Sequence, residues 1–361
     1  MAEYPNISRE NNFDLIRLFA ALQVVFFHVQ DRLGIIIPYM DWFRNFKGVP
    51  IFFTVSGFLI TSSFLRNKNE IRVYFINRYL RLFPALYVLI IATTLSALFL
   101  GCISINNIIS SDYLKWVIRW ASYDQNYTPA FWQLFGTGIP NGSLWTIPVE
   151  LSFYILIPFM FFIKRKNLLF IIIFSLSIIS IYSNYLFHDF NSINPTIQTF
   201  TFSIIPYLYY FFIGAFMYLM WGKIKPYVEN KFFYYFGLLI FLIISDAFSP
   251  SLGFHTSMKV HTIKELVMNL LLIVTTISAA FTQKNAAKIL HGKDLSYGIY
   301  LYHGLIINIV IELVSNRSFW LYILVFSFSI LSAWFSWNYV EKPCLAMKTK
   351  LGNFFVNNKF L

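Results

Sequence analysis

The chain has 361 residues, of which 58% are hydrophobic and 12% are charged, about half the charged fraction of an ordinary soluble domain. These values exclude a soluble globular protein and predict a polytopic membrane protein. The formal net charge of +12 would suggest a nucleic-acid partner in a soluble chain, but here Lys and Arg retained in cytoplasmic loops explain it. No nucleic-acid partner is implied.

Ten hydrophobic runs long enough to cross a bilayer follow one another along the chain. They begin near residues 12, 47, 83, 143, 167, 202, 231, 264, 295 and 318. When alternate links are assigned to opposite sides, most Lys and Arg residues fall on the side that holds both termini, which is therefore cytoplasmic. The prediction is an all-α polytopic protein with about ten transmembrane helices. They form a single transmembrane domain that ends near residue 343, followed by a basic cytoplasmic tail over residues 344–361.

The first span, residues 11–30, carries ionisable side chains at Asp14, Arg17 and His28. Arg17 and His28 are eleven positions apart, so they lie about 20° apart around a helix and about 16 Å apart along it. One helix face therefore presents both side chains. Ionisable residues inside a span face a protein interior or a water-filled cavity, which favours a functional site. For Arg17 alone, a side chain that snorkels to the lipid headgroups is an equally good interpretation.

Two short motifs lie on either side of the first predicted cytoplasmic link. Ser56 and Gly57 are in the second span, where small residues usually permit close helix packing. Arg78 and Arg81 share a helix face at i, i+3, and Pro84 is predicted to begin the third span. Guanidinium groups at that position suit a phosphate-bearing ligand from the cytoplasm. Their charge alone is also explained by the positive-inside rule and by affinity for anionic lipid.

The longest external segment, residues 104–142, is rich in aromatic residues. Five of its aromatic side chains are predicted to form either a belt at the membrane interface or stacking platforms for sugar rings: Trp116, Trp120, Tyr123, Tyr127 and Trp132. The sequence leaves both interpretations open.

Two later spans carry further polar residues. Span four begins with Trp145 near its start, and it places Glu150 about two turns into the membrane with Tyr154 on the same face. A lone carboxylate at that depth needs a partner or must be neutral. In span nine, Tyr300 and His303 share one helical face. A structural histidine bonded to a neighbouring carbonyl is the rival interpretation of His303.

Six motifs in this order resemble the acyltransferase 3 family of integral membrane acyltransferases. They are Phe13-Asp-Leu-Ile-Arg17 with His28, Gly48-Val with Ser56-Gly57-Phe58-Leu59, Arg78-Tyr-Leu-Arg81 before Pro84, Ser143-Leu-Trp-Thr-Ile-Pro-Val-Glu150, Ser296-Tyr-Gly-Ile-Tyr-Leu-Tyr-His303, and Val340-Glu-Lys-Pro343. The resemblance covers about residues 11–343. It implies transfer of an acyl group, most often acetyl, from cytoplasmic acyl-coenzyme A to a hydroxyl group outside the cytoplasm. The implied acceptor is a cell-envelope glycan, such as O-antigen, capsule or exopolysaccharide, or a lipid-linked oligosaccharide.

The resemblance also implies a location and partners. The expected location is the bacterial inner membrane, in contact with membrane lipids, with acetyl-CoA as donor substrate and with neither a tightly bound cofactor nor a metal. Many relatives carry a fused extracytoplasmic hydrolase-like domain. This chain is expected to resemble the stand-alone members, which acylate the acceptor directly or pass the group to a separate extracytoplasmic acyl-handling protein.

Acyl transfer from a thioester needs a base for the acceptor hydroxyl, a site for the donor and stabilisation of the oxyanion. His28 is the predicted base, and a covalent acyl-histidine intermediate stays open. Glu150 is predicted to orient His28 or balance its charge, and His303 with Tyr300 to line the acyl path or polarise the thioester carbonyl. The remaining assignments are donor binding for Arg17, Arg78 and Arg81, and a substrate path formed by Asp14, Ser56, Trp145, Tyr154 and Tyr300.

A transporter or exporter for glycans is the rival class, in which the buried Arg, Glu and His residues form a proton or substrate path. Transporters commonly contain paired repeats and broken helices, and the sequence has no evident internal symmetry. Consumption of acetyl-coenzyme A would separate the two classes, because a transporter would not consume it.

Overall fold

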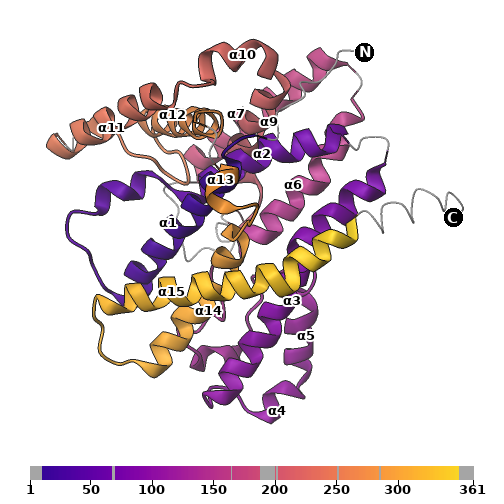
Figure 1. The fold of residues 1–361 in the computed structure, drawn as a ribbon, viewed down its shortest axis with the longest axis vertical. Helices are drawn as coiled ribbons and strands as arrows, with labels where there is room; N and C mark the ends of the chain where they lie inside the picture. Colours follow the sequence, from indigo (N-terminus) through magenta and orange to yellow (C-terminus); the bar gives the residue numbers. More distant parts are fainter. Residues whose placement is uncertain are drawn as a thin grey trace, which may run out of the picture. The chain divides into compact units, whose positions relative to one another are not determined.

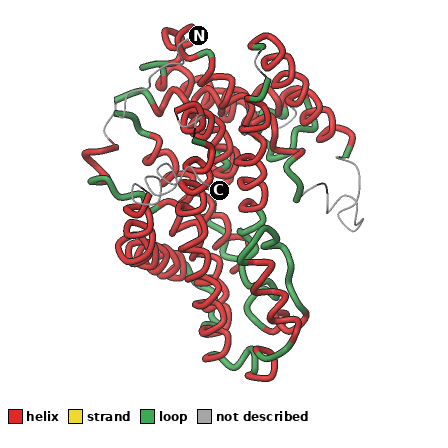
Figure 2. The backbone as a smooth tube through the Cα atoms, turned by 90° about the vertical axis from the view of Figure 1, so that its right-hand side faces the viewer, coloured by secondary structure: helices red, strands yellow, loops and turns green. Residues whose placement is uncertain are grey.

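The computed structural model describes residues 10–66, 70–163, 165–187, 200, 202–249, 252–283 and 286–348. Within these ranges all regular structure is helical, as Figure 2 shows. The chain divides into two compact units, each assembled from three segments. The first unit comprises Met1–Ala20, Pro38–Lys68 and Ser152–Lys293, and the second comprises Ala21–Ile37, Asn69–Leu151 and Asp294–Leu361.

Seven helices of the described residues are long and apolar enough to cross a membrane. They are α1 (Phe13–Leu33), α2 (Gly48–Arg66) with the short helix η1 (Asp41–Asn45) before it, α3 (Ile71–Phe99), α7 (Lys166–Leu186), α12 (Ile263–Ala280), α14 (Ser296–Leu313), and α15 (Trp320–Ser336) with its continuation to Lys348. The all-helical membrane fold is thereby confirmed.

Three further predicted spans correspond to helices of other kinds. The pair Ile205–Leu219 and Trp221–Val228, which contains η3 (Ile205–Tyr207), α9 (Leu208–Leu219) and α10 (Trp221–Val228), is bent by 100°. The helices α6 (Thr146–Phe161) and α11 (Phe232–Phe248) are apolar but shorter. The count of ten spans, the cytoplasmic termini and the single transmembrane domain therefore stay predictions.

The third span does not begin at Pro84. The helix α3 begins at Ile71, so Arg78, Arg81 and Pro84 all lie inside it. A proline removes one backbone donor from a helix, and spans tolerate that loss because neighbouring groups satisfy the freed carbonyl. The predicted helix start at Pro84 is therefore wrong.

The last span also extends beyond its predicted end. After α15 the chain makes a π-helical turn, η5 (Trp337–Glu341), and the helix then continues to Lys348. The predicted stop before Pro343 is wrong, because the wider turn just before Pro343 gives the proline ring room. Glu341, in that turn, is buried and accepts a hydrogen bond from Ser336 at 2.9 Å. Residues 349–361 of the predicted tail lie outside the described residues.

In the first unit, α2 and α9 pack with their backbones in contact. A Cβ atom added to Gly57 would overlap the carbonyl oxygen of Phe211, and one added to Gly214 would overlap that of Thr54. Small residues allow this approach in an apolar environment. The close-packing interpretation of Gly57 is confirmed.

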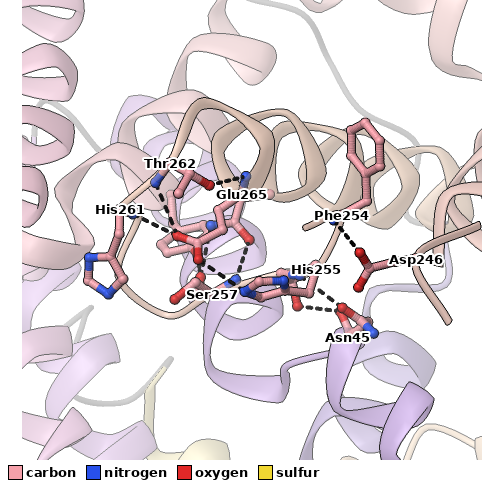
Figure 3. Close-up of polar contacts among 11 residues, drawn as sticks. Asn45, Asp246, Phe254, His255, Ser257, His261, Thr262 and Glu265 are labelled. Atoms are coloured by element: carbon pink, nitrogen blue, oxygen red, sulfur yellow. Dashed lines mark hydrogen bonds and ion pairs between the residues drawn. The ribbon is translucent and has the colours of Figure 1, made fainter. Parts of the chain in front are cut away.

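The connection between α11 and α12, also in the first unit, is held by Glu265, which is buried (Figure 3). One carboxylate oxygen lies 3.0 Å from His255 Nε2, and the other accepts the backbone N–H of His261 at 2.7 Å. Thr262 begins α12 as its N-cap, and its hydroxyl accepts the Glu265 N–H at 3.1 Å. A carboxylate in the first turn is also favoured by the helix dipole.

In the second unit, α14 packs against both α15 and α3, as Figure 1 shows. The short helices α4 (Ile105–Ile108), α5 (Ser111–Trp120) and η2 (Ala130–Leu134) follow α3, and α13 (Ala286–Leu290) belongs to the first unit.

The three tryptophans of the predicted external segment form a buried cluster. Trp116, Trp120 and Trp132 are each 0% exposed, and the Trp116 ring lies 4.8 Å and 4.7 Å from the rings of Trp120 and Trp132. Both surface interpretations, the interfacial belt and the sugar platforms, are therefore wrong for the three tryptophans. They stay predictions for Tyr123, which is exposed, and Tyr127, which is half-buried. The tryptophan rings instead give α5 and η2 a small hydrophobic core, because burial of such large side chains stabilises an otherwise polar segment.

We predict that Gly57→Ala lowers the free energy of unfolding by about 1–3 kcal/mol or more, because the added methyl group overlaps a backbone carbonyl. Thermal unfolding of the detergent-solubilised protein measures the effect. The control is Gly237→Ala, since a Cβ atom on Gly237 of α11 meets nothing within 4 Å. Equal unfolding temperatures for the two variants would contradict the packing argument.

Candidate active site

Two histidines and a serine meet in the second unit. His28 Nδ1 lies 2.9 Å from His303 Nε2, and the Ser143 hydroxyl lies 3.2 Å from the first nitrogen and 3.0 Å from the second. His303 and Ser143 are 0% and 2% exposed, and His28 is half-buried. The structure thus brings together two of the three predicted catalytic residues and adds a serine that was not predicted as a site residue.

The contact between the two histidines defines which ring nitrogens carry protons. His303 Nδ1 lies 3.2 Å from the carbonyl oxygen of Ile299, one turn earlier in α14, so it carries a proton and donates. In the neutral ring, Nε2 of His303 is then an acceptor. A contact of 2.9 Å from that acceptor requires a proton on His28 Nδ1. We therefore assign the His28 proton to Nδ1, which leaves Nε2 unprotonated, with its lone pair available to accept a proton.

The Ser143 hydroxyl completes this arrangement. His28 Nδ1, His303 Nε2 and Ser143 Oγ lie within 3.2 Å of one another. The two protons available for these contacts are on His28 Nδ1 and Ser143 Oγ. With His28 unprotonated at Nδ1 instead, its lone pair would face that of His303. The Ser143 hydroxyl fits the tautomer assigned from His303, because it can accept from His28 Nδ1 and donate to His303 Nε2.

Asn308 of α14 makes hydrogen bonds to the backbone of residues 137–140, in the segment that precedes α6. The Asn308 side-chain oxygen accepts the backbone N–H of Thr137 at 3.1 Å, and its amide nitrogen donates to the carbonyls of Ile139 and Pro140 at 2.8 Å and 2.9 Å. These bonds satisfy the backbone of an irregular segment inside a largely buried environment.

A second asparagine sets the position of Ser143. Asn141 donates to the carbonyl of Leu301 at 2.8 Å and accepts the Ser143 backbone N–H at 3.1 Å. Gly304 makes room for it, because a Cβ atom there would overlap the Asn141 side chain. The contacts of Asn141 with α14 thus hold the Ser143 hydroxyl 3.0 Å from His303 Nε2.

Tyr300 links the same elements from the other side of Ser143. Its hydroxyl donates to the Ser143 carbonyl at 2.8 Å and lies 2.8 Å from the Thr146 hydroxyl at the start of α6. The side chain is buried and lies close enough to Glu150 for an electrostatic interaction. The rings of Tyr300 and His303 lie 5.8 Å apart on α14, and the role of Tyr300 in the substrate path stays a prediction.

Glu150 and Trp145 are half-buried, Glu150 in α6 and Trp145 directly before it. The contacts that orient the His28 ring come from His303 and Ser143. The predicted role of Glu150, to orient His28 or to balance its charge, stays a prediction.

The predicted donor-binding arginines of α3 lie near the start of α14. Arg81 forms an ion pair with Asp294, whose other carboxylate oxygen accepts from the backbone N–H and the hydroxyl of Ser296 at 3.1 Å and 2.5 Å. The Arg81 and Asp294 side chains are 13% and 10% exposed. Arg78 is half-buried one turn earlier. Arg81 therefore has a structural partner that the sequence prediction did not include.

Four predicted site residues belong to the first unit. Asp14 is exposed and Arg17 is half-buried, both at the start of α1. Ser56 is half-buried in α2, and Tyr154 is buried in α6. Each keeps its predicted role as a hypothesis.

A small cavity adjoins His28. Its volume is about 20 Å³, and its lining includes His28, Ser143, Gly142 and Arg32. A cavity of this volume holds about one water-sized group. It therefore has room for one hydroxyl group next to the imidazole.

Sequence reasoning missed Ser143, Asn141, Asn308 and Arg32 as parts of the site. Ser143 is the first residue of a motif that was recognised, Asn141 stands two residues before it, and Arg32 follows His28 by one helical turn. Their closeness to recognised residues could have marked Ser143 and Arg32 as candidates. The asparagines became informative only when their bonds to α14 were visible.

The acyltransferase 3 family, described as an acyltransferase domain, matches residues 10–338. Nodulation protein 10 of Rhizobium leguminosarum bv. viciae is 30% identical over 358 residues, which cover 94% of this chain and 95% of that protein. The peptidoglycan O-acetyltransferase OatA of Listeria monocytogenes is 28% identical over 184 residues, which cover 47% of this chain and 28% of that protein. The chain thus spans only part of the length of this second relative. No solved structure matches it.

We predict that Asp294→Asn lowers the free energy of unfolding by about 3–5 kcal/mol, because it leaves Arg81 without its carboxylate in a mostly buried position. Thermal unfolding measures the loss. The double variant Arg81→Gln, Asp294→Asn should cost less than the sum of the single variants by about 0.5–3 kcal/mol. Strictly additive effects would show that the pair has no structural role.

Proposed function

Because the chain belongs to the acyltransferase 3 family, we propose that it is a bacterial inner-membrane O-acetyltransferase that modifies a hydroxyl group of a cell-envelope glycan. The family, the long apolar helices and the acyltransferase class are the premise. The acetyl-CoA donor, the glycan acceptor and the direction of transfer across the membrane are the proposal.

The observation that supports the proposal best is the hydrogen-bonded contact between His28 and His303. It gives His28 a fixed orientation and an unprotonated Nε2, which is what a general base for a hydroxyl group needs. The arrangement follows the logic of a base oriented by a second group, with His303 in the orienting role. His303 is thus a positioning residue, in place of the thioester-polarising role considered from sequence.

The reaction that this arrangement supports is direct transfer. The acceptor hydroxyl enters the cavity, His28 Nε2 removes its proton, and the oxygen attacks the thioester carbonyl. The tetrahedral intermediate then loses the coenzyme A thiolate, which takes the proton back from His28. An ester and free coenzyme A are formed, and the imidazole returns to its starting state.

The proton on His28 Nδ1 also favours His28 as the base. Protonation of Nε2 leaves the proton on Nδ1 in place, so the bond to His303 persists through the cycle. The same bond strengthens when the donor ring becomes charged. The bond between His28 and His303 therefore stabilises the protonated His28 ring, which the transition state resembles.

For the donor we propose that Arg17, Arg78 and Arg81 interact with the phosphate groups of acetyl-CoA. Guanidinium groups bind phosphate through paired hydrogen bonds, and Arg78 lies one turn from Arg81 on α3. Arg81 already pairs with Asp294, so its contribution to donor binding would use the donors that Asp294 leaves available.

For the acceptor, the name of the Listeria relative indicates a peptidoglycan substrate in that protein. We extend only the broader class, an envelope glycan or a lipid-linked oligosaccharide, to this chain. Direct transfer needs no separate acyl-handling protein, and such a partner stays a prediction.

We predict that His28→Ala removes acetyl esters from an envelope glycan in cells that contain the variant at normal abundance. Mass spectrometry compares glycans from cells that lack the protein, cells with the wild type restored, and cells with the variant. A glycan should lose the mass of one acetyl group in the first and third cases and regain it in the second. His291→Ala, at an exposed histidine of the first unit, should keep the wild-type pattern.

Two outcomes would overturn this assignment. Full acetylation with His28→Ala would exclude His28 as an essential base. Identical substituents in all strains, with different amounts of glycan outside the cell, would replace the enzyme by an exporter.

A further inference from the structure

We propose that Arg32 binds an anionic group, a carboxylate or a phosphate, on the acceptor glycan and thereby makes the enzyme selective for acidic acceptors. This inference rests on the proposed function and adds a substrate class to it. It concerns the opening of the cavity at His28, which belongs to the second unit.

Arg32 lies beside the reacting groups. It follows His28 by four residues on α1, so the two side chains share a helix face. Side chains of a helix lean toward its N-terminus, which turns the guanidinium back toward His28. A Cβ atom on Gly142 would lie 3.0 Å from Arg32 Nη2, so the guanidinium rests over Gly142, next to Ser143.

The charge of Arg32 has no internal counterpart. Within the part of the chain that the structure describes, the guanidinium makes no hydrogen bond or ion pair, and no Asp or Glu is among the residues around the cavity. Three other arginines have a carboxylate partner: Arg81 pairs with Asp294, Arg119 with Asp124 and Arg44 with Asp41. Arg32 is set apart by its position beside His28 and the cavity. Arg32 is also exposed, so a ligand can reach it.

The size of the cavity determines which part of the substrate meets Arg32. About 20 Å³ accommodates the reacting hydroxyl and little more. The sugar ring and its other substituents must then lie at the opening, where Arg32 is exposed. The guanidinium therefore contacts the body of the acceptor, at a distance from the reacting carbonyl.

The chemistry of the guanidinium group selects the ligand. Its planar fork matches the two oxygens of a carboxylate or of a phosphate, and the resulting charge-assisted bonds are about twice as strong as neutral ones. Thr137 and Asn308 also line the cavity and are already engaged with each other, so Arg32 is the charged group left to make this contact.

The test uses the acceptor of the cell itself. The glycan is extracted from cells that lack the protein, so it is unacetylated, and one portion is carboxyl-reduced while another is dephosphorylated. The wild type, Arg32→Gln and Arg32→Lys are then assayed in purified form with radiolabelled acetyl-CoA. Arg317→Gln, at an exposed arginine between α14 and α15, is the control.

We expect Arg32→Gln to raise the KM for the intact acceptor about tenfold to hundredfold, with a smaller increase for Arg32→Lys. The wild type should show the same increase with whichever treated acceptor has lost the anion, which identifies that anion as a carboxylate or a phosphate. Arg32→Gln should use this treated acceptor as well as the wild type does, which shows that the variant is folded. Arg317→Gln should match the wild type throughout.

An acceptor without carboxylate or phosphate groups would overturn the inference, as would equal losses for Arg32→Gln with intact and treated acceptors or an unchanged KM. All three results would leave the O-acetyltransferase in place. If no glycan loses acetyl groups in cells that lack the protein, the proposed function fails and the role of Arg32 falls with it.

Discussion

The hydrogen bond from His303 Nδ1 to the carbonyl of Ile299 is the contact on which the rest of the site depends. It turns the other nitrogen of His303 into an acceptor, which places the proton of His28 on Nδ1 and leaves the lone pair of Nε2 available. One backbone carbonyl of α14 thus determines the chemistry of a side chain on α1. Because His303 is fully buried, water does not compete for this bond, and the order of donors and acceptors is maintained.

The same helix also holds the irregular segment that carries Ser143. Asn308, Asn141 and Tyr300 bind backbone groups or side chains of residues 137–146, so α14 acts as the template for both halves of the site. An unpaired backbone group costs several kcal/mol in an apolar environment, on the order of the cost of losing a hydrogen bond there. The polar side chains of α14 therefore stabilise the segment and give it one conformation.

Much of this was predictable from sequence. Long apolar runs gave the helices, and the rarity of ionisable residues in them pointed to His28 and His303. The start of α3 was missed, because Pro84 resembles a helix boundary although a span tolerates it. The tryptophans were misplaced, because aromatic side chains suit both an interface and a core. The partners of Arg81 and His28 depend on contacts across more than 200 residues, which no local pattern encodes.

The tautomer of His28 tests the account most directly. Solid-state ¹⁵N NMR of the histidine-labelled protein in lipid bilayers distinguishes protonated from unprotonated ring nitrogens, and His28→Asn and His303→Asn assign the signals. We expect a proton on Nδ1 and none on Nε2 for both His28 and His303 in the wild type. A proton on His28 Nε2 would contradict the account, because that nitrogen could not then take the proton of an acceptor hydroxyl.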